Sequence, residues 1–290
     1  SRGNTADIIG FASRTIEENL GGGALAVFLQ GCCGDINPAM YKDIHNPRDA
    51  EPLGNMLGLS ALRAWRTIAT RDRGELKVIH QTIALPRATD LEQRIARIEA
   101  EQTRLLRSLK GTSLNFKTFL PLLVQYQTSG DFPSSPSHRY LHEKSLGREG
   151  LGKLDEENRT NSERYLQNIH TMEELTRLQV NRDLLKKHQA ANAAAGKPVV
   201  DAEVMGIRIG DFVLVTFPGE LTVEIGLGIK ARAPGPFTFV AACTNGYLYY
   251  APTAEQRNNT GFAQEDCDCL LAPQWQAIYD RAVDAILEKL

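Results

Sequence analysis

The chain has 290 residues, 42% of them hydrophobic, and a formal net charge of −2. This length and hydrophobic fraction suffice for one large core or two small ones, and the near-neutral charge argues against a nucleic-acid partner, which requires a concentrated basic face. The longest apolar stretches have the length of a strand, so we expect no transmembrane segment.

The first predicted element is a strand at residues 24–30. Its apolar run, Ala24–Leu29, does not alternate with polar residues, which is typical of a strand covered on both faces. A loop follows whose residues permit tight turns and close backbone approach to a ligand: Gly31, Gly34, Asp35, Asn37 and Pro38. Because α/β enzymes place their sites where a buried strand ends in such a loop, this loop is a candidate site, with a purely structural turn as the alternative.

A strand is predicted next at 76–85, and a helical insertion follows at residues 88–195. Its first helix carries a heptad-like apolar stripe made of Leu91, Ile95, Ile98, Leu105 and Leu109. A turn rich in Pro and Ser, Ser129–Pro136, precedes a second helix from about Asp155 to Ala195. The two helices predict an antiparallel hairpin. Three roles stay open for it: packing on the main domain, a lid over the substrate cleft, or a surface for homo-oligomer formation.

Strands at 200–209 and 211–217 are predicted to form a hairpin, because Gly210-Asp211 is a favoured two-residue turn. Pro218-Gly219 ends the second of these strands, and Glu220 then opens a helical pattern. A carboxylate at a helix N-terminus is stabilised by the exposed N–H groups and the helix dipole, which accounts for Glu220 by itself. Alternatively, its side chain points into a crevice at the end of the strand, where it could bind a metal ion.

The last predicted strand, 237–242, ends in the polar turn Thr244–Gly246. Three tyrosines, Tyr247, Tyr249 and Tyr250, follow within four residues. Such a density of aromatic residues usually reflects packing, in which each hydroxyl reaches a partner at the rim. Packing and a catalytic role are therefore the two alternatives for this segment.

These elements predict an α/β fold with mixed β-sheet layers flanked by helices and a long helical-hairpin insertion. A final helix, Pro273–Leu290, has one apolar face and should pack on the sheet. The chain is interpreted as a single catalytic domain, 1–290, with the insertion inside it.

Cysteines and histidines add little to this picture. The five cysteines do not form a disulfide framework by count, and Cys32 and Cys33 are interpreted as compact residues that let the loop pack closely. His138 and His142 are four residues apart and could share a helix face, but prolines lie close by and no acidic partner stands at motif spacing, which favours a solvated pair over a metal site. His45, His170 and His188 are interpreted as isolated surface residues.

Three segments, in this order, carry a resemblance to a known family: Phe28–Gly31 with Gly34–Pro38, Phe217–Thr222, and Asn245–Tyr250 followed by Thr253. Together they resemble the catalytic domain of the neutral/alkaline (non-lysosomal) ceramidases, over roughly residues 5–85 and 200–290. The first is similar to the glycine loop that carries the family's serine. The second is similar to Pro-(Ala/Gly)-Glu-Phe-Thr, whose glutamate binds zinc, and the third to Asn-x-Tyr-x-x-Tyr-x-x-Thr, whose second tyrosine is a zinc ligand.

The resemblance implies Glu220 and Tyr250 as zinc ligands. It also implies that Gly34, Asp35, Tyr247 and Phe262 border the substrate. In that family two zinc-binding histidines belong to motifs that would lie upstream of Ser1, so we expect the chain to lack its natural beginning and to supply at most half of a four-ligand zinc site.

Two positions depart from the family's pattern. Asn37 stands where the ceramidases have the serine, and its amide can instead donate to a developing oxyanion. Phe262 stands where the family has a tyrosine near the reacting amide. The implied function is a zinc-dependent hydrolase of an amide (N-acyl) bond in a small-molecule or lipid-like substrate, and the alternative is a catalytically inactive binding or assembly module. The residues leave the compartment open, while the resemblance favours a secreted or periplasmic location.

Overall fold

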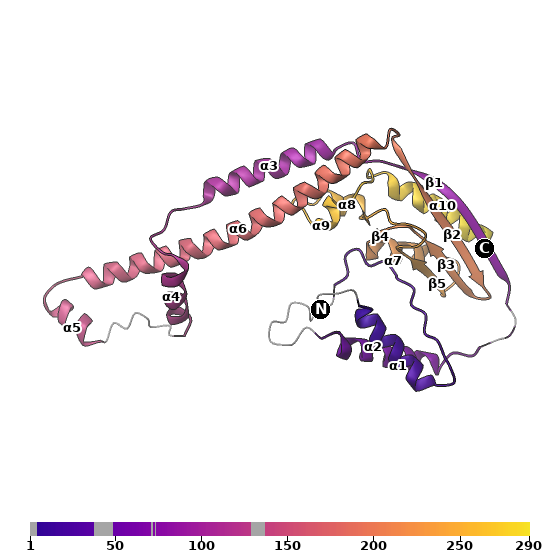
Figure 1. Ribbon diagram of the computed structural model, residues 1–290, viewed down its shortest axis with the longest axis horizontal. Helices are drawn as coiled ribbons and strands as arrows, with labels where there is room; N and C mark the ends of the chain where they lie inside the picture. Colours follow the sequence, from indigo (N-terminus) through magenta and orange to yellow (C-terminus); the bar gives the residue numbers. More distant parts are fainter. Residues whose placement is uncertain (1–4, 38–48, 71, 73, 129–136) are drawn as a thin grey trace. The chain divides into compact units, whose positions relative to one another are not determined.

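The computed structural model describes residues 5–37, 49–70, 72, 74–128 and 137–290. It divides into two compact units, the first made of Ser1–Asp90 with His188–Leu290 and the second of Leu91–Lys187 (Figure 1). A mixed sheet with helices confirms the predicted α/β class. The second unit lies within the predicted insertion 88–195, whereas the assignment of residues 1–290 to a single catalytic domain stays a prediction.

Unit 1 is built on a four-stranded sheet in the order β1-β2-β3-β5. Its strands are β1 (Leu76–Pro86), β2 (Val199–Ile209), β3 (Phe212–Thr216) and β5 (Thr238–Ala241). β1 and β2 pair antiparallel from Leu76↔Ile209 to Pro86↔Val199, so the two strands that flank the helical segment are direct neighbours. β2 and β3 are also antiparallel, whereas β3 and β5 are parallel. All four predicted strands in this part of the chain are confirmed.

The hairpin between β2 and β3 has the predicted two-residue turn. Ile209 pairs with Phe212, and Gly210 has a φ of +59°. That backbone conformation is one that glycine adopts without the penalty a side chain would add.

The core of unit 1 lies between the sheet and α10 (Trp275–Lys289), which packs on β1 and β2 as predicted for the final helix. Trp275 and Tyr279 are fully buried, and their polar atoms are satisfied: the indole N–H donates to the Pro252 carbonyl (3.1 Å) and the phenol to the Thr216 carbonyl (3.2 Å). A side chain at Gly206 would collide with Ile286 of this helix. Each fully buried large apolar side chain contributes about 1.5–3 kcal/mol, so this helix is a main source of stability for the unit.

Unit 1 also contains two helices near the start of the chain, α1 (Asp7–Leu20) and α2 (Ala50–Trp65). They pack against each other where α2 has glycines, since side chains at Gly54 and Gly58 would collide with α1. The hydroxyl of Thr15 donates to Asn55 Oδ1 (2.9 Å) across the same contact.

The predicted strand at 24–30 is wrong. These residues form no strand, and Leu25 and Val27 are 80% and 76% exposed. Only a single backbone bond joins this stretch to the sheet within the described part of the chain, from the Ala242 N–H to the Gln30 carbonyl (2.9 Å). An apolar run becomes a buried strand only where other elements cover it, and none of the described elements does so here.

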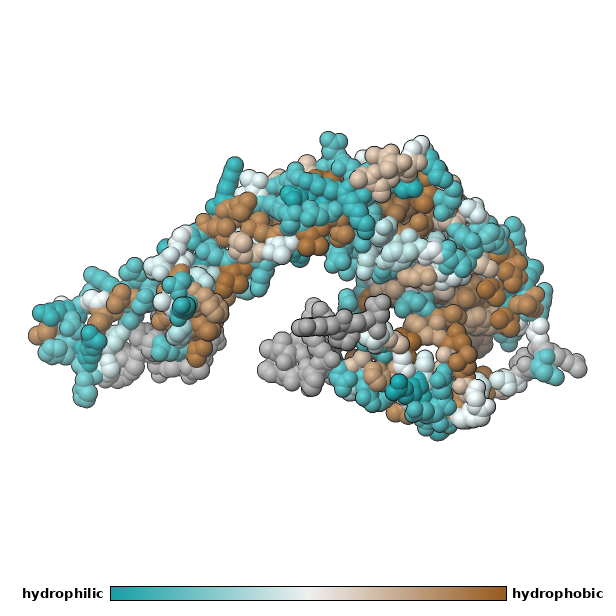
Figure 2. Space-filling model, viewed as in Figure 1, coloured by the Kyte–Doolittle hydropathy of each residue, from teal (hydrophilic) through white to brown (hydrophobic). Residues whose placement is uncertain are grey.

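Apolar surface also gathers over the sheet of unit 1 (Figure 2). Exposed large apolar side chains in this part include Leu227 of α7 (Val223–Arg232) and Phe237 and Phe239 at β5, together with Leu76, Val78 and Ile209 on β1 and β2. β5 pairs with β3 along one edge, and this leaves its other edge largely unpaired among the described residues.

Unit 2 contains α3 (Leu91–Ser108), α4 (Phe116–Thr128), α5 (His138–Ser145) and most of α6 (Gly150–Ala194). α3 and α6 run antiparallel: Lys186 pairs with Glu99 near one end (3.2 Å), and Asn168 bonds both backbone groups of Lys110 near the other (3.1 and 2.7 Å). Ile98, Leu178 and Leu185 are fully buried. The helical hairpin is thus confirmed, α4 and α5 were not predicted, and the turn Ser129–Pro136 lies outside the described residues.

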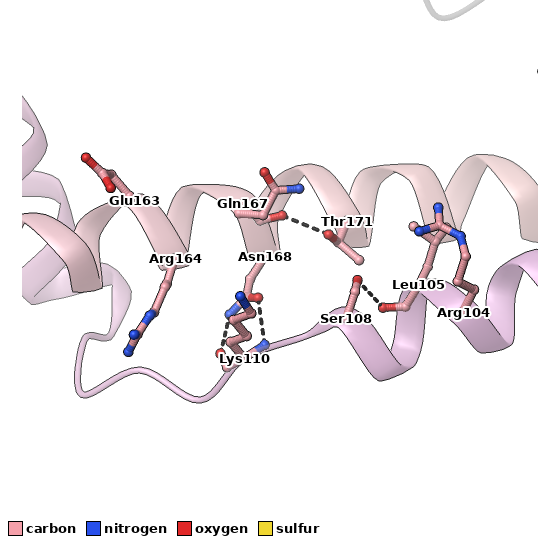
Figure 3. A pocket seen from close by; sticks show the side chains of 9 residues that line it. All are labelled: Arg104, Leu105, Ser108, Lys110, Glu163, Arg164, Gln167, Asn168 and Thr171. Carbon is pink, nitrogen blue, oxygen red and sulfur yellow. Dashed lines mark hydrogen bonds between the residues drawn. The ribbon is translucent and has the colours of Figure 1, made fainter.

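A polar pocket of about 480 Å³ lies between the end of α3 and α6 (Figure 3). Arg104, Lys110, Glu163 and Arg164 are among its lining residues, and Arg104 is already bonded to Glu101 (2.8 Å). None of the side chains predicted to act on a substrate lines this pocket.

The described helices include none that is both long and apolar enough to cross a membrane.

Candidate functional site

Glu220 and Tyr250 are direct partners in a short parallel pair formed by β4 (Glu220–Leu221) and β6 (Tyr250–Ala251). Paired residues on neighbouring strands project to the same face, so both side chains lie on one side of the pair. The Tyr250 hydroxyl donates a hydrogen bond to the Glu220 carboxylate. The two implied zinc ligands therefore meet with their oxygens in contact.

Tyr247 joins this pair from the preceding turn. Its hydroxyl donates to Glu220 Oε1, and its ring lies edge-on to Tyr249 with centroids 5.3 Å apart. The turn is tight, since Asn245 and Tyr249 both have positive φ values, of +62° and +61°. Glu220, Tyr247 and Tyr250 thus form a cluster of three oxygen-bearing side chains, which we call the carboxylate–tyrosine cluster.

Both phenols of this cluster hold their protons firmly. Desolvation raises the pKa of Tyr247 and of Tyr250 well above the usual value near 10, and the negative charge of Glu220 together with the bond to it raises both further. At neutral pH the two hydroxyls are therefore donors to the carboxylate. A bound cation would reverse this balance, because it stabilises phenolate and replaces the protons as the partner of Glu220.

The expectation that Glu220 opens a helix is wrong. Glu220 belongs to β4, and α7 begins three residues later at Val223 with Thr222 as its N-cap. The exposed N–H of Val223 donates to Asp35 Oδ1 (2.7 Å), so Asp35 supplies the carboxylate at the helix N-terminus. Glu220 is released from that structural role, and its side chain faces the two tyrosines.

The glycine loop lies directly against β4. The Gly34 N–H donates to the Leu221 carbonyl (2.9 Å), and a Cβ at Gly34 would come within 2.8 Å of the Glu220 carbonyl oxygen. Asp35 Oδ2 also accepts from Gln256 Nε2 (3.2 Å), so both oxygens of this carboxylate are engaged in holding the loop. The loop and the carboxylate–tyrosine cluster are therefore fixed side by side.

Asn37 and Phe262 are the remaining predicted site residues. Asn37 is exposed at the end of the described part of the loop, and Pro38 lies outside the described residues. Phe262 is half-buried in the segment before α9 (Gln264–Cys267) and has a φ of +52°. Their roles stay predictions.

His188 was predicted to lie on the surface, and this is wrong. Its side chain is 1% exposed, its Nε2 lies 2.6 Å from Asp268 Oδ1, and its ring meets that of Tyr249 edge-on at 4.7 Å. Sequence periodicity carries a signal for it, because Leu178 and Leu185 place His188 on the same apolar stripe of α6.

No group of three or more His, Cys, Asp or Glu side chains among the described residues is arranged to hold a metal ion. The carboxylate–tyrosine cluster contains one carboxylate and two phenols, and so has fewer than three ligands of those types. Both phenol oxygens nonetheless contact the Glu220 carboxylate, and carboxylate oxygen is an established zinc ligand.

Comparison with solved structures shows a ceramidase-like fold. The chain aligns over 100% of its length with a ceramidase complexed with C2, at a TM-score of 0.53 and 15% identity. It aligns equally completely with the neutral ceramidase from Pseudomonas aeruginosa, at a TM-score of 0.51 and 16% identity. The chain spans 43% and 42% of the length of these two proteins. No family model matches the sequence, and no curated protein does.

Proposed function

We propose that this chain is a ceramidase-like hydrolase that uses zinc to cleave the amide (N-acyl) bond of a lipid-like substrate. The observation that carries the proposal is the contact of Tyr247 and Tyr250 with Glu220 beside the glycine loop. The ceramidase-like fold supports it, since the whole length of the chain aligns with two solved ceramidases.

The donor set fits zinc in part. Glu220 and Tyr250 would hold the ion through a carboxylate and a phenolate oxygen, and the proton that Tyr250 now donates to Glu220 would leave on binding. Further ligands would have to come from outside the described residues. When bound, zinc polarises a carbonyl and lowers the pKa of a water molecule from 15.7 towards about 7.

The neighbouring residues would orient the substrate. Tyr247 would keep its proton, because its pKa is raised, and donate a hydrogen bond at the rim of the site. Asn37 would donate from its amide to the oxygen of the reacting carbonyl; it cannot act as a nucleophile as a serine does, so water must attack. Gly34 and Asp35 would hold the loop in place, and Phe262 would offer an apolar contact.

A binding or assembly module without catalysis is the second candidate. Asn37 and Phe262 replace the two hydroxyl-bearing residues of the family's pattern, which favours this alternative. In addition, the carboxylate of Glu220 accepts hydrogen bonds from both phenols, which is a partner set that needs no metal ion.

Zinc titration of the metal-free chain, followed by assays on N-acyl substrates of several chain lengths, separates the two candidates. For the hydrolase we expect zinc binding that weakens by more than about tenfold in Glu220→Gln and in Tyr250→Phe. The matched control is Glu203→Gln, a carboxylate on β2 bonded to Asn245. Two outcomes would favour the module: zinc binding without amide cleavage, and the absence of both zinc binding and cleavage.

A further inference from the structure

Two cysteine thiols from distant parts of the sequence meet beside the carboxylate–tyrosine cluster. Cys33 lies in the glycine loop and is half-buried, while Cys243 follows β5 and is exposed. Their thiol groups are hydrogen-bonded to each other, and both lie close enough to Glu220 to sense its charge.

Backbone bonds hold both cysteines in this position. On one side, the loop is anchored by the bond from Gly34 N–H to the Leu221 carbonyl (2.9 Å). On the other, Cys243 donates its own N–H to the Gly219 carbonyl (3.0 Å), and the adjacent Ala242 N–H reaches Gln30 in the segment that leads into the loop. These backbone bonds fix the segment of Cys33 and the segment of Cys243 in the same part of unit 1, where the two thiols interact.

The other three cysteines are placed differently. Cys32, although adjacent in sequence, packs against α7: a Cβ at Gly226 would lie 2.5 Å from its Sγ. Cys267 and Cys269 are completely buried. Cys33 and Cys243 are thus the pair that combines mutual contact with access for a reagent.

We propose that Cys33 and Cys243 are a redox-active pair that a small-molecule disulfide, such as oxidised glutathione, converts to an intramolecular disulfide. One thiol loses its proton and attacks a sulfur of the reagent, which releases one glutathione thiol and leaves a mixed disulfide. The second cysteine then attacks the protein sulfur of that adduct and releases the second glutathione thiol. The net change is two protein thiols oxidised and one disulfide reduced, and the new bond ties the glycine loop to the turn after β5.

The surroundings of the pair set its rate. Burial raises the pKa of the Cys33 thiol, and burial together with Cys33 and Glu220 raises that of Cys243 to about 12. Since the thiolate is the attacking species, exchange should be slow at neutral pH and accelerate about tenfold per pH unit through mildly alkaline pH.

The test is oxidation of the reduced full chain with oxidised glutathione at mildly alkaline pH, followed by thiol counting and peptide mapping under non-reducing conditions. We expect the loss of two thiols, a peptide linking Cys33 to Cys243, reversal by dithiothreitol, and a rise of roughly 5 °C in the unfolding midpoint. Cys243→Ser, at an exposed position, should abolish the link, as should Cys33→Ser, whereas the matched control Cys32→Ser should retain it.

Three results would overturn the proposal: stable mixed disulfides without the link, a link between Cys32 and Cys243 that survives in Cys33→Ser, or retention of all thiols throughout the pH range. The readout is thiol chemistry alone, so the outcome is independent of whether the chain hydrolyses amides.

Discussion

Asp268 connects His188 to Tyr250: its carboxylate is the partner of the buried imidazole, and its backbone carbonyl accepts the N–H of Tyr250 (3.2 Å). Since an ionised carboxylate can only accept, the ring nitrogen facing it carries the proton. The histidine also supports Tyr249, the residue in the left-handed conformation just before Tyr250. A residue on α6 thereby holds the turn that aims the tyrosines at Glu220.

His188→Ala should consequently lower the free energy of unfolding of unit 1 by about 2–3 kcal/mol, because it leaves a largely buried carboxylate without its partner and opens a gap beside Tyr249. Denaturant unfolding followed by the fluorescence of buried Trp275 measures this. His170→Ala is the control: it removes an exposed histidine from the same helix, whose bond to Glu173 is long at 3.4 Å, and should change stability by less than about 0.5 kcal/mol. Equal effects of the two substitutions would contradict the role of His188.

Gly34→Ala should destabilise the glycine loop, because the added methyl group would approach the Glu220 carbonyl to 2.8 Å and the backbone on both sides is bonded in place. Overpacking of this kind costs about 1–3 kcal/mol. Gly31→Ala is the matched control in the same loop, since nothing lies within 4 Å of its Cβ position. Thermal unfolding of both variants measures this difference in stability. An unchanged unfolding midpoint in Gly34→Ala would show that the loop can move away from β4.

The raised pKa values of Tyr247 and Tyr250 make a prediction for alkaline pH. Between the unfolded value near 10 and the higher folded values, the unfolded state has lost these phenol protons while the folded state keeps them. Unfolding then releases protons, so stability is fully present below about pH 10 and falls as the pH rises through this window. Denaturation at a series of alkaline pH values tests the sign.

Glu220→Gln should shift the titration of these phenols to lower pH, because it removes the negative charge that helps to hold their protons and leaves a neutral amide oxygen as the acceptor. Tyrosinate absorbance measures the shift, with Glu203→Gln as the control for the loss of a carboxylate elsewhere in the unit. An unchanged titration curve in Glu220→Gln would mean that the three side chains are not in contact in solution.

Replacement of residues 91–187 with a short linker should leave unit 1 folded. β1 and β2 pair over their whole length up to Pro86↔Val199, and the cost of loop closure depends only weakly on length. His188 must be kept, because its bond to Asp268 belongs to unit 1. Circular dichroism and thermal unfolding report the fold. If unit 1 is unfolded in this variant, the helical unit is required for the core of unit 1.

The same deletion variant tests whether the helical unit acts as a lid that selects substrates. If the helical unit selects substrates, the rates on N-acyl substrates of different chain lengths should change relative to one another while the shortest substrate is affected least. An unchanged profile across chain lengths would exclude a role in selection.

Much of the fold follows from local pattern in the sequence. The strands β1, β2, β3 and β5, the helices α3, α6 and α10, and the turn at Gly210 all appear where periodicity and turn chemistry predict them. These features depend on neighbours three or four residues away at most, which a single sequence displays directly. The contact of Glu220 with Tyr250 was expected as well, through the resemblance of the two motifs to those of a known family.

Other features depend on what covers a segment, and only the tertiary structure decided them. Residues 24–30 have the composition of a buried strand, but no described element covers them on both faces, so most of them stay exposed and one backbone bond, from the Ala242 N–H to the Gln30 carbonyl, joins them to the end of β5. His188 is polar, yet Asp268 meets it from a segment 80 residues away and makes its burial favourable. Glu220 sits in a helical pattern, but Asp35 occupies the helix N-terminus and leaves Glu220 to the tyrosines. In each case the outcome depended on the presence or absence of a partner distant in sequence, because burial and hydrogen bonding are properties of the assembled neighbours and not of the segment itself.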